Sequence, residues 1–224
     1  MKTPAFLALA SSATAASIPR NSNSFRSTDA DIKNVPWQAE YSVEGSFQCG
    51  GTIINSCYIV TTGHCTGGIR SASDLSIHIG SRVDHDIALV KLTSEIQFSD
   101  SVKAAGLVDA TVAPGTKAHL SGWGKTETGF PNTLREEDLD VISLADCKSK
   151  LSDTDIHVTD RNMCTFTSGK SPCNGSSGSS LVVNGKLAAV PSTVYECGST
   201  KYPSNHTDIG NKSIRDFIHD TAGV

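Results

Sequence analysis

Long hydrophobic runs and clusters of positive charge are both missing from this sequence. Beyond its first residues, no stretch approaches the roughly 18 apolar residues that a membrane-spanning helix needs. The chain carries 19 basic and 23 acidic residues, a net charge of −4, and its basic residues form no run that could bind a phosphate backbone. We therefore expect neither a membrane protein nor a nucleic-acid-binding protein.

Paired cysteine motifs are missing as well. The chain has seven cysteines, but none of them form a Cys-x-x-Cys pair of the kind found in structural zinc sites. A zinc site is the competing interpretation, and this spacing disfavours it. In an exported protein, seven cysteines predict disulfide bonds with one thiol left over. We expect no metal and no cofactor.

The first 27 residues carry the pattern of an exported protein. A basic start, an apolar run over 4–10 and small residues over 13–16 predict a secretory signal over 1–16, cut near Ala15 or Ala16. A hydrophobic N-terminal helix of the fold is the alternative, and the shortness of the run disfavours it. Residues 17–27 then form a polar, propeptide-like arm with Arg20 and Arg26 as candidate processing sites. We expect the protein to be secreted.

Residues 173–181, Cys-Asn-Gly-Ser-Ser-Gly-Ser-Ser-Leu, are typical of a turn that presents a serine nucleophile. Glycines on both sides permit a sharp turn, which exposes a hydroxyl and aims backbone N–H groups at an oxyanion. Taken alone, the stretch could equally be a flexible loop. Two upstream segments favour the catalytic interpretation: 61–65, Thr-Thr-Gly-His-Cys, and 84–92, Asp-His-Asp-Ile-Ala-Leu-Val-Lys-Leu.

In this order, the three segments resemble the chymotrypsin and trypsin family of serine proteases, which carries Ala-Ala-His-Cys, Asp-Ile-Ala-Leu and Gly-Asp-Ser-Gly-Gly. The segments 35–38 (Val-Pro-Trp-Gln) and 121–124 (Ser-Gly-Trp-Gly) agree, and the resemblance runs from about Thr28 to the C-terminus. It implies an all-β fold of two antiparallel Greek-key β-barrels with a C-terminal helix. It also implies a monomer that acts on protein or peptide substrates and that protein inhibitors could block.

The resemblance assigns roles to individual residues. His64, Asp86 and Ser177 would be catalytic, and the backbone N–H groups of Gly175 and Ser177 would form the oxyanion hole. The substrate-binding residues would be Ser171, Ser192, Thr193, Val194 and Ser204, with Ser192 also supporting the aspartate. The implied disulfides are Cys49–Cys65, Cys147–Cys164 and Cys173–Cys197, which leave Cys57 over.

The chain departs from the family pattern at the activation site and in the specificity pocket. Family members pair a new N-terminal ammonium with an aspartate just before the nucleophile; here Ser176 holds that position, and the matching upstream segment is Ser-Phe-Arg-Ser over 24–27. Because both partners of this ion pair are missing, no buried charge is left unpaired. Ser171 makes the pocket floor neutral, and Val194 and Ser204 replace two glycines, which predicts a narrow pocket for small residues.

These departures leave two hypotheses. The first is a secreted serine endopeptidase with weak or altered activity and an acyl-enzyme mechanism. The second is a catalytically inactive pseudoprotease that acts as a binding scaffold or decoy. The residues of the triad favour the first hypothesis, whereas the filled pocket and the missing ion pair favour the second.

Hydrophobic patterning places the remaining elements. Residues 48–65 read as two antiparallel strands with a turn at Asn55-Ser56, residues 75–79 as a strand, and Asn184-Gly185 as a hairpin turn. Ile214, Phe217 and Ile218 lie at helical spacing near the C-terminus.

Only 22 positions separate His64 from Asp86, which predicts a shortened first barrel. We expect a peptidase domain over 28–224, with its first barrel over 28–112 and its second over 113–224.

Overall fold

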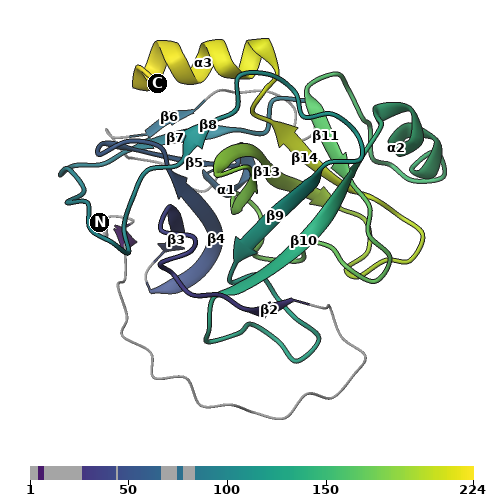
Figure 1. Cartoon of the computed structure of the whole chain (residues 1–224), viewed down its shortest axis with the longest axis horizontal. Helices are drawn as coiled ribbons and strands as arrows, with labels where there is room; N and C mark the ends of the chain where they lie inside the picture. Colours follow the sequence, from purple (N-terminus) through teal and green to yellow (C-terminus); the bar gives the residue numbers. More distant parts are fainter. Residues whose placement is uncertain (1–4, 8–26, 44, 67–74, 78–83) are drawn as a thin grey trace.

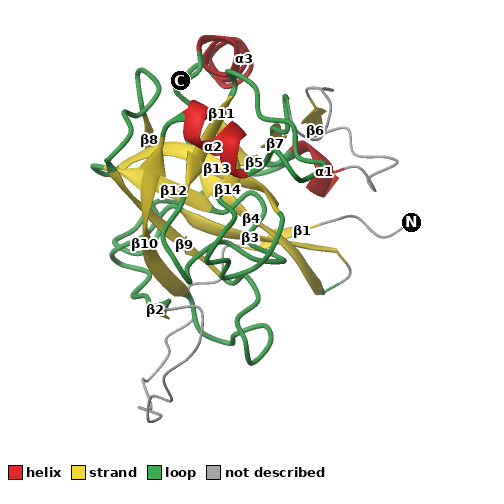
Figure 2. Ribbon diagram, turned by 90° about the vertical axis from the view of Figure 1, so that its right-hand side faces the viewer, coloured by secondary structure: helices red, strands yellow, loops and turns green. Residues whose placement is uncertain are grey.

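Two β-sheets and three helices make up a computed structural model of the chain, which describes residues 5–7, 27–43, 45–66, 75–77 and 84–224 (Figure 1). Strands dominate the described part, and the helices lie around the sheets (Figure 2). The elements, in chain order, are β1 (Ala5–Leu7), β2 (Thr28–Asp29), β3 (Gln38–Val43), β4 (Ser46–Ile53), β5 (Tyr58–Thr61), α1 (Gly63–Thr66), β6 (Leu75–Ile77), β7 (Ala88–Lys91), β8 (Gly106–Leu107), β9 (Lys117–Gly122), β10 (Arg135–Ile142), α2 (Leu144–Lys150), β11 (Asn162–Thr165), β12 (Ser180–Val183), β13 (Lys186–Val194), β14 (Ser204–Asp208) and α3 (Lys212–Ala222).

The first sheet has six strands in the order β1-β3-β4-β5-β7-β6. The hairpin predicted over 48–65 is confirmed by the antiparallel pairing of β4 and β5, in which Ile53 lies opposite Ile59. Its turn is fixed by Asn55, whose Oδ1 accepts hydrogen bonds from the backbone N–H groups of Cys57 and Tyr58, both at 2.8 Å. The strand predicted over 75–79 is β6, and residues 78–79 lie outside the described residues.

The second sheet follows the order β11-β14-β13-β12-β9-β10-β2, with β8 parallel to β13. Asn184 and Gly185 turn the β12–β13 hairpin with φ values of 49° and 76°. Both φ values are positive, as a two-residue type I′ hairpin turn requires, so this predicted turn is confirmed. At one edge of the sheet, β2 pairs with the beginning of β10.

The largest apolar cluster among the described residues joins the two sheets and α3. It combines Val60 and Leu89 of the first sheet with Leu120 and Leu181 of the second, all of them buried. α3 packs on this core through Ile214 and Ile218, and both are completely buried. Its amphipathic pattern therefore predicted the helix correctly, and the all-β fold class with a C-terminal helix is confirmed.

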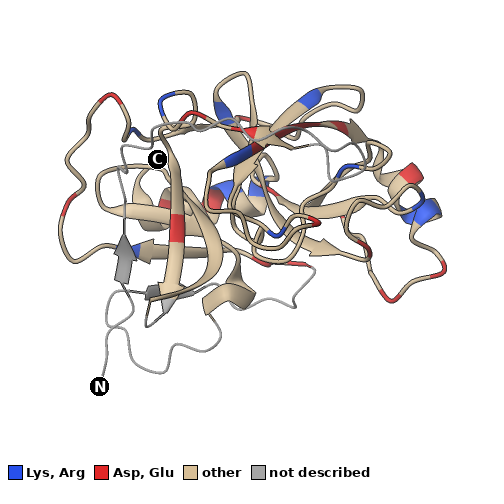
Figure 3. Cartoon of the chain, turned by 90° about the horizontal axis from the view of Figure 1, so that it is seen from below, with Lys and Arg blue, Asp and Glu red and all other residues tan. Residues whose placement is uncertain are grey.

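The N-terminal predictions fall largely outside the described residues. Of the predicted signal over 1–16, only β1 is described, and it pairs with β3; of the predicted arm over 17–27, only Ser27 is described. Within the part of the chain that the structure describes, no helix is long and apolar enough to cross a membrane. Charged residues of both signs are scattered over the face seen in Figure 3.

Candidate active site

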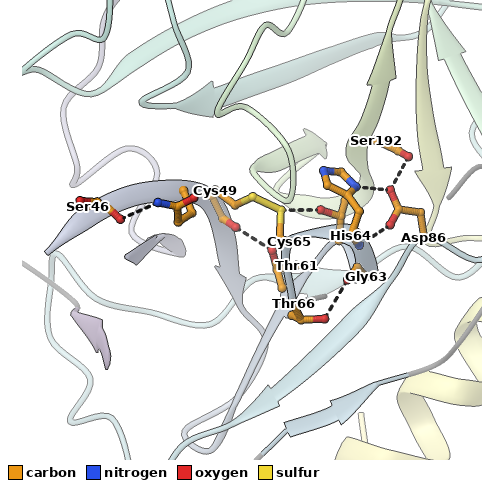
Figure 4. The surroundings of a disulfide bond; sticks show 12 residues. Ser46, Cys49, Thr61, Gly63, His64, Cys65, Thr66, Asp86 and Ser192 are labelled. Carbon is orange, nitrogen blue, oxygen red and sulfur yellow. Dashed lines mark hydrogen bonds and ion pairs between the residues drawn. A yellow bond between two sulfur atoms is a disulfide. The ribbon is translucent and has the colours of Figure 1, made fainter. Parts of the chain in front are cut away.

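His64 of α1 and Asp86, which precedes β7, form a hydrogen-bonded pair in which only the carboxylate is fully buried. Asp86 Oδ2 lies 2.7 Å from His64 Nδ1, and Asp86 Oδ1 accepts the backbone N–H of His64 at 2.8 Å (Figure 4). The carboxylate is 1% exposed, whereas the imidazole is 22% exposed. Because an ionised carboxylate only accepts hydrogen bonds, this contact places the proton of a neutral imidazole on Nδ1. His64 Nε2 is then left with a lone pair that can accept a proton.

The second sheet holds Asp86 in place. Ser192 of β13 donates its hydroxyl to Asp86 Oδ2 at 2.5 Å, and Thr207 of β14 donates to the backbone carbonyl of Asp86 at 2.8 Å. Two residues earlier, Arg161 donates from Nε and Nη2 to the two carboxylate oxygens of Asp84, each at 2.9 Å. The segment that carries Asp86 is therefore clamped from three points on the second half of the chain.

The serine turn is built against β4 and β13. Gly50 of β4 donates its N–H to the carbonyl of Ser177 at 2.8 Å, and Gly178 donates its N–H to the carbonyl of Pro191 at 3.1 Å. Gly178 has φ +75°, and a Cβ there would lie 2.2 Å from Thr61 Oγ1 and 2.6 Å from the carbonyl oxygen of Gly50. Only glycine fits this position, both for its backbone conformation and for its contacts.

Disulfide bonds link the elements that meet at this site. The three bonds are Cys49–Cys65, Cys147–Cys164 and Cys173–Cys197, so each pairing implied by the resemblance is present. The first joins the neighbour of Gly50 to the neighbour of His64, and thereby ties the strand that contacts Ser177 to the helix that carries His64. Cys57 is the one cysteine outside a disulfide.

Two serines, Ser179 and Ser180, follow the nucleophile turn where the family has glycine and proline. The two differ in whether their hydroxyl groups are hydrogen-bonded. Ser180 Oγ donates to Gln38 Oε1 at 2.7 Å and lies 2.8 Å from Ser121 Oγ, so its hydroxyl is part of a buried polar network. Ser179 is also completely buried, but its Oγ has no hydrogen-bond partner among the described residues. An unpaired buried hydroxyl costs free energy, whereas a paired one does not.

We therefore expect Ser179→Ala to raise the free energy of unfolding by about 1 kcal/mol, because it removes an unpaired hydroxyl and keeps Cβ. The matched variant Ser180→Ala should lower that free energy by about 1 kcal/mol, because it breaks a satisfied network. Urea unfolding of both variants measures the difference. Equal losses of stability in the two variants would show that Ser179 Oγ finds a partner in solution.

A cleft of about 310 Å³ runs past His64 and Ser177, which both line it. Three of the five predicted substrate-binding residues, Ser192, Thr193 and Val194, form one wall of this cleft. Ser171 and Ser204 are 6% and 2% exposed and lie outside its lining. Ser171 Oγ instead accepts the N–H of Gly198 at 2.6 Å. The residue expected at the pocket floor therefore does not line the cleft.

Part of the lining of the cleft was not predicted. Asp155 and Ile156 line the cleft from the loop after α2, and Asp155 is its only acidic residue within the described part of the chain. Pro172, Cys173, Asn174 and Pro191 complete the lining. A short polar loop following a helix has no local pattern that predicts which cavity it borders, so only the folded structure could place it.

The architecture and the arrangement of His64, Asp86 and Ser177 define the class of trypsin-like serine proteases. The family model named Trypsin matches residues 25–218. Trypsin alpha-4 of Lucilia cuprina is 32% identical over 204 residues, which cover 80% of this chain and 80% of that protein. Trypsin delta of Drosophila melanogaster is 32% identical over 214 residues, with 84% and 83% covered.

A solved structure agrees with these relatives in fold. Neuropsin, a serine protease expressed in the limbic system of mouse brain, superposes with a TM-score of 0.76 at 24% identity. The superposition covers 88% of this chain and 98% of neuropsin. The present chain therefore belongs to the trypsin family.

Proposed function

We propose that this protein is a secreted serine endopeptidase that hydrolyses peptide bonds through an acyl-enzyme. The observation that carries the proposal is the contact of 2.7 Å between Asp86 Oδ2 and His64 Nδ1, because His64 lines the same cleft as Ser177. The proposal includes removal of residues 1–16 on export, action as a monomer on protein or peptide substrates, and control by protein inhibitors. It assigns the catalytic roles to His64, Asp86 and Ser177.

The reaction begins when His64 Nε2 accepts the proton of Ser177 Oγ, which attacks the carbonyl carbon of the substrate. The backbone N–H groups of Gly175 and Ser177 donate hydrogen bonds to the oxyanion that forms. His64 then gives its proton to the leaving amine, and water hydrolyses the acyl-enzyme by the same route. Asp86 stays ionised throughout, keeps the imidazole in one tautomer and stabilises its charged form.

The shape of the cleft limits the substrate side chain that precedes the cleaved bond. Thr193 and Val194 line the cleft, whereas the neutral Ser171 and Ser204 are buried outside its lining. Added volume is poorly tolerated where side chains already fill the space, and Ser171 supplies no charge at the expected pocket floor. We assign a preference for small, uncharged side chains at this position.

A second candidate function, a pseudoprotease that binds proteins without cleaving them, is favoured by one observation. No hydrogen bond joins Ser177 Oγ to His64 in the part of the chain that the structure describes, and Ser176 replaces the aspartate that orders the turn in the family. Catalytic hydrogen bonds are often long before substrate binds, so this contact alone does not decide between the two functions.

Covalent labelling of the serine distinguishes the endopeptidase from the pseudoprotease. We expect a fluorophosphonate probe to form an adduct on Ser177, because the probe needs both the activated hydroxyl and the oxyanion hole. Mass spectrometry of the secreted protein detects the adduct. Ser177→Ala should abolish it, whereas Ser179→Ala, in the same turn, should keep it. A folded, disulfide-bonded chain that stays unlabelled would contradict the proposed hydrolysis and favour the binding scaffold.

A further inference from the structure

Two aromatic rings close on the backbone of the serine turn at Gly175. A Cβ added to Gly175 would lie 2.8 Å from Phe47 Cε1 and 2.9 Å from Phe130 Cε1. The two rings lie edge to face, with their centroids 6.0 Å apart and their planes at 71° to each other. Aromatic rings attract one another in this arrangement. We call Phe47 and Phe130 the aromatic pair.

The aromatic pair joins the two halves of the chain across the serine turn. Phe47 belongs to β4, which also carries Cys49, the disulfide partner of Cys65. Phe130 belongs to the loop between β9 and β10 of the second sheet. Phe47 is half-buried, whereas Phe130 is 59% exposed, so burial in a core does not explain the position of its ring. The contacts that do hold the ring are those with Phe47 and with the turn.

Backbone hydrogen bonds shape the loop that carries Phe130. The backbone N–H of Thr126 donates to the carbonyl of Gly129 at 2.8 Å, and the N–H of Gly129 donates back to the carbonyl of Thr126 at 3.1 Å. At the base of this small turn, the backbone N–H of Lys125 donates to the carbonyl of Asn174 at 2.8 Å. The loop is therefore tied directly to the serine turn, and its aromatic ring lies over that turn.

The hydrogen bond from Lys125 sets the direction of the Gly175 N–H. The carbonyl of Asn174 and the N–H of Gly175 belong to one planar peptide group and point in opposite directions. A rotation of this peptide group would break the bond to Lys125 and turn the N–H away. Within the described part of the chain, the Gly175 N–H donates to no protein acceptor, as a donor reserved for an oxyanion requires.

Gly175 needs such restraint because of its conformation. It has φ +85°, which glycine adopts and leaves without steric cost. Gly115 and Gly185 also have positive φ, but nothing lies within 4 Å of a Cβ placed on either of them. Gly175 differs from these two exposed glycines in being covered by two rings. The cover restrains the residue whose N–H is assigned to the oxyanion hole.

We propose that the aromatic pair positions the oxyanion hole. Phe130, packed on Phe47, holds the loop over 125–130 against the serine turn and so keeps the N–H of Gly175 directed at the oxyanion. The two phenylalanines act through Gly175 and are therefore positioning residues. An apolar contact thus orders a turn in which Ser176 has replaced the aspartate of the family's ion pair. The effect on reactivity rests on the proposed function, whereas the order of Gly175 does not.

The first test measures the motion of the Gly175 N–H by NMR in the whole chain. Relaxation gives an order parameter of about 0.85 for a rigid backbone and below about 0.6 for a flexible one, and relaxation dispersion detects slower rotation. We expect Gly175 to be rigid in the unchanged chain, mobile in Phe130→Ala, and rigid again in Phe130→Tyr, which keeps the ring. Phe98→Ala is the matched control, because Phe98 is 51% exposed and does not line the cleft. A rigid Gly175 in Phe130→Ala, or a mobile one in the unchanged chain, overturns the proposal.

The second test measures the rate of fluorophosphonate labelling at Ser177. We expect Phe130→Ala to slow labelling about tenfold, the loss expected when the competent turn is populated about a tenth of the time. Phe130→Tyr and Phe98→Ala should stay within about twofold of the unchanged chain. Phe47→Ala should slow labelling by a similar factor to Phe130→Ala, and the double variant by little more, because both rings act on one glycine. Losses that multiply in the double variant would show two independent effects and contradict the pair.

Peptide hydrolysis distinguishes positioning from direct contact with the substrate. A positioning role lowers kcat and the labelling rate together, whereas a substrate contact raises KM and leaves the small probe unaffected. The latter result in Phe130→Ala would overturn the proposal. Circular dichroism verifies that each variant is folded.

The two tests together separate the aromatic pair from the proposed hydrolase. A Gly175 that becomes mobile in Phe130→Ala, in a chain whose Ser177 is never labelled, would support the pair and contradict the hydrolase. A labelled Ser177 with no change at Gly175 in Phe130→Ala would do the reverse.

Discussion

Asp86→Asn is expected to lower kcat for peptide hydrolysis by about 10⁴-fold, the loss that the same change causes in the chymotrypsin-type triad. Asp86 Oδ2 faces both His64 Nδ1 and the hydroxyl of Ser192, at 2.7 and 2.5 Å. An amide has only one acceptor oxygen, so the variant side chain cannot satisfy the imidazole, the serine and the backbone N–H of His64 together. With an NH₂ group facing Nδ1, the imidazole carries its proton on Nε2 and no longer accepts the proton of Ser177.

Asp84→Asn is the matched control, since it makes the same chemical change two residues away. It weakens the paired contacts with Arg161 but leaves the three hydrogen bonds to the Asp86 carboxylate in place. We expect it to lower kcat by less than tenfold. Steady-state cleavage of a fluorogenic peptide library measures both variants, with circular dichroism to verify folding. A loss of similar size in the two variants would show that Asp86 acts only by supporting this segment.

The sequence predicted the parts of the site that lie in short contiguous motifs. The turn around Ser177 and the Thr-Thr-Gly-His-Cys segment of His64 each carry their geometry locally, because glycines and neighbouring cysteines constrain a few adjacent residues. The β12–β13 hairpin was predictable for the same reason, since Asn184 and Gly185 supply both positive φ angles. The resemblance supplied the disulfide pairing, which composition alone could not.

α2 was missed although its N-terminus carries a local signal. Ser143 accepts the backbone N–H of Asp146 at 3.0 Å and donates its hydroxyl to the Asp146 carboxylate at 2.6 Å, a reciprocal cap three residues apart. The alternating apolar residues before the cap, Leu139 and Val141, belong to β10, which ends at Ile142. The capping pattern marks where this strand ends and the helix begins.

The burial of Glu137 on β10 could be predicted only in part. Within the run Arg-Glu-Glu-Asp over 135–138, Glu137 reads as one surface charge among four. Its phase with Leu139 and Val141 was the available signal that it faces inward. That β2 lies beside this part of β10 depends on strand register over more than 100 positions of sequence, which no local pattern specifies. The same limit applies to Asp155 in the cleft.

The unchanged chain is expected to lose stability at acidic pH through His206, and His206→Gln should remove much of this loss. His206 of β14 is completely buried, and Thr165 Oγ1 lies 2.8 Å from its Nε2. Burial lowers the pKa of His206 to about 3, against an ordinary value of 6.5. Below pH 6.5 the unfolded chain binds a proton that the folded chain does not, so the free energy of unfolding falls as pH falls from 6.5 towards 3. Over the two units from 6.5 to 4.5, this amounts to about 3 kcal/mol.

Comparing the unchanged chain with His206→Gln isolates the contribution of His206. The comparison is needed because the titration of Glu137 changes stability in the opposite direction. Its raised pKa makes the folded chain bind the extra proton between about 7 and 4.5, which increases stability as pH falls in both proteins alike. Urea unfolding at pH 7 and pH 4.5 should therefore show His206→Gln gaining about 3 kcal/mol relative to the unchanged chain between the two values. His219→Gln, at an exposed histidine of α3, is the matched control and should show no such gain. Parallel pH profiles for the unchanged chain and His206→Gln would mean that the folded chain admits a proton at His206, and hence that β14 opens to solvent on acidification.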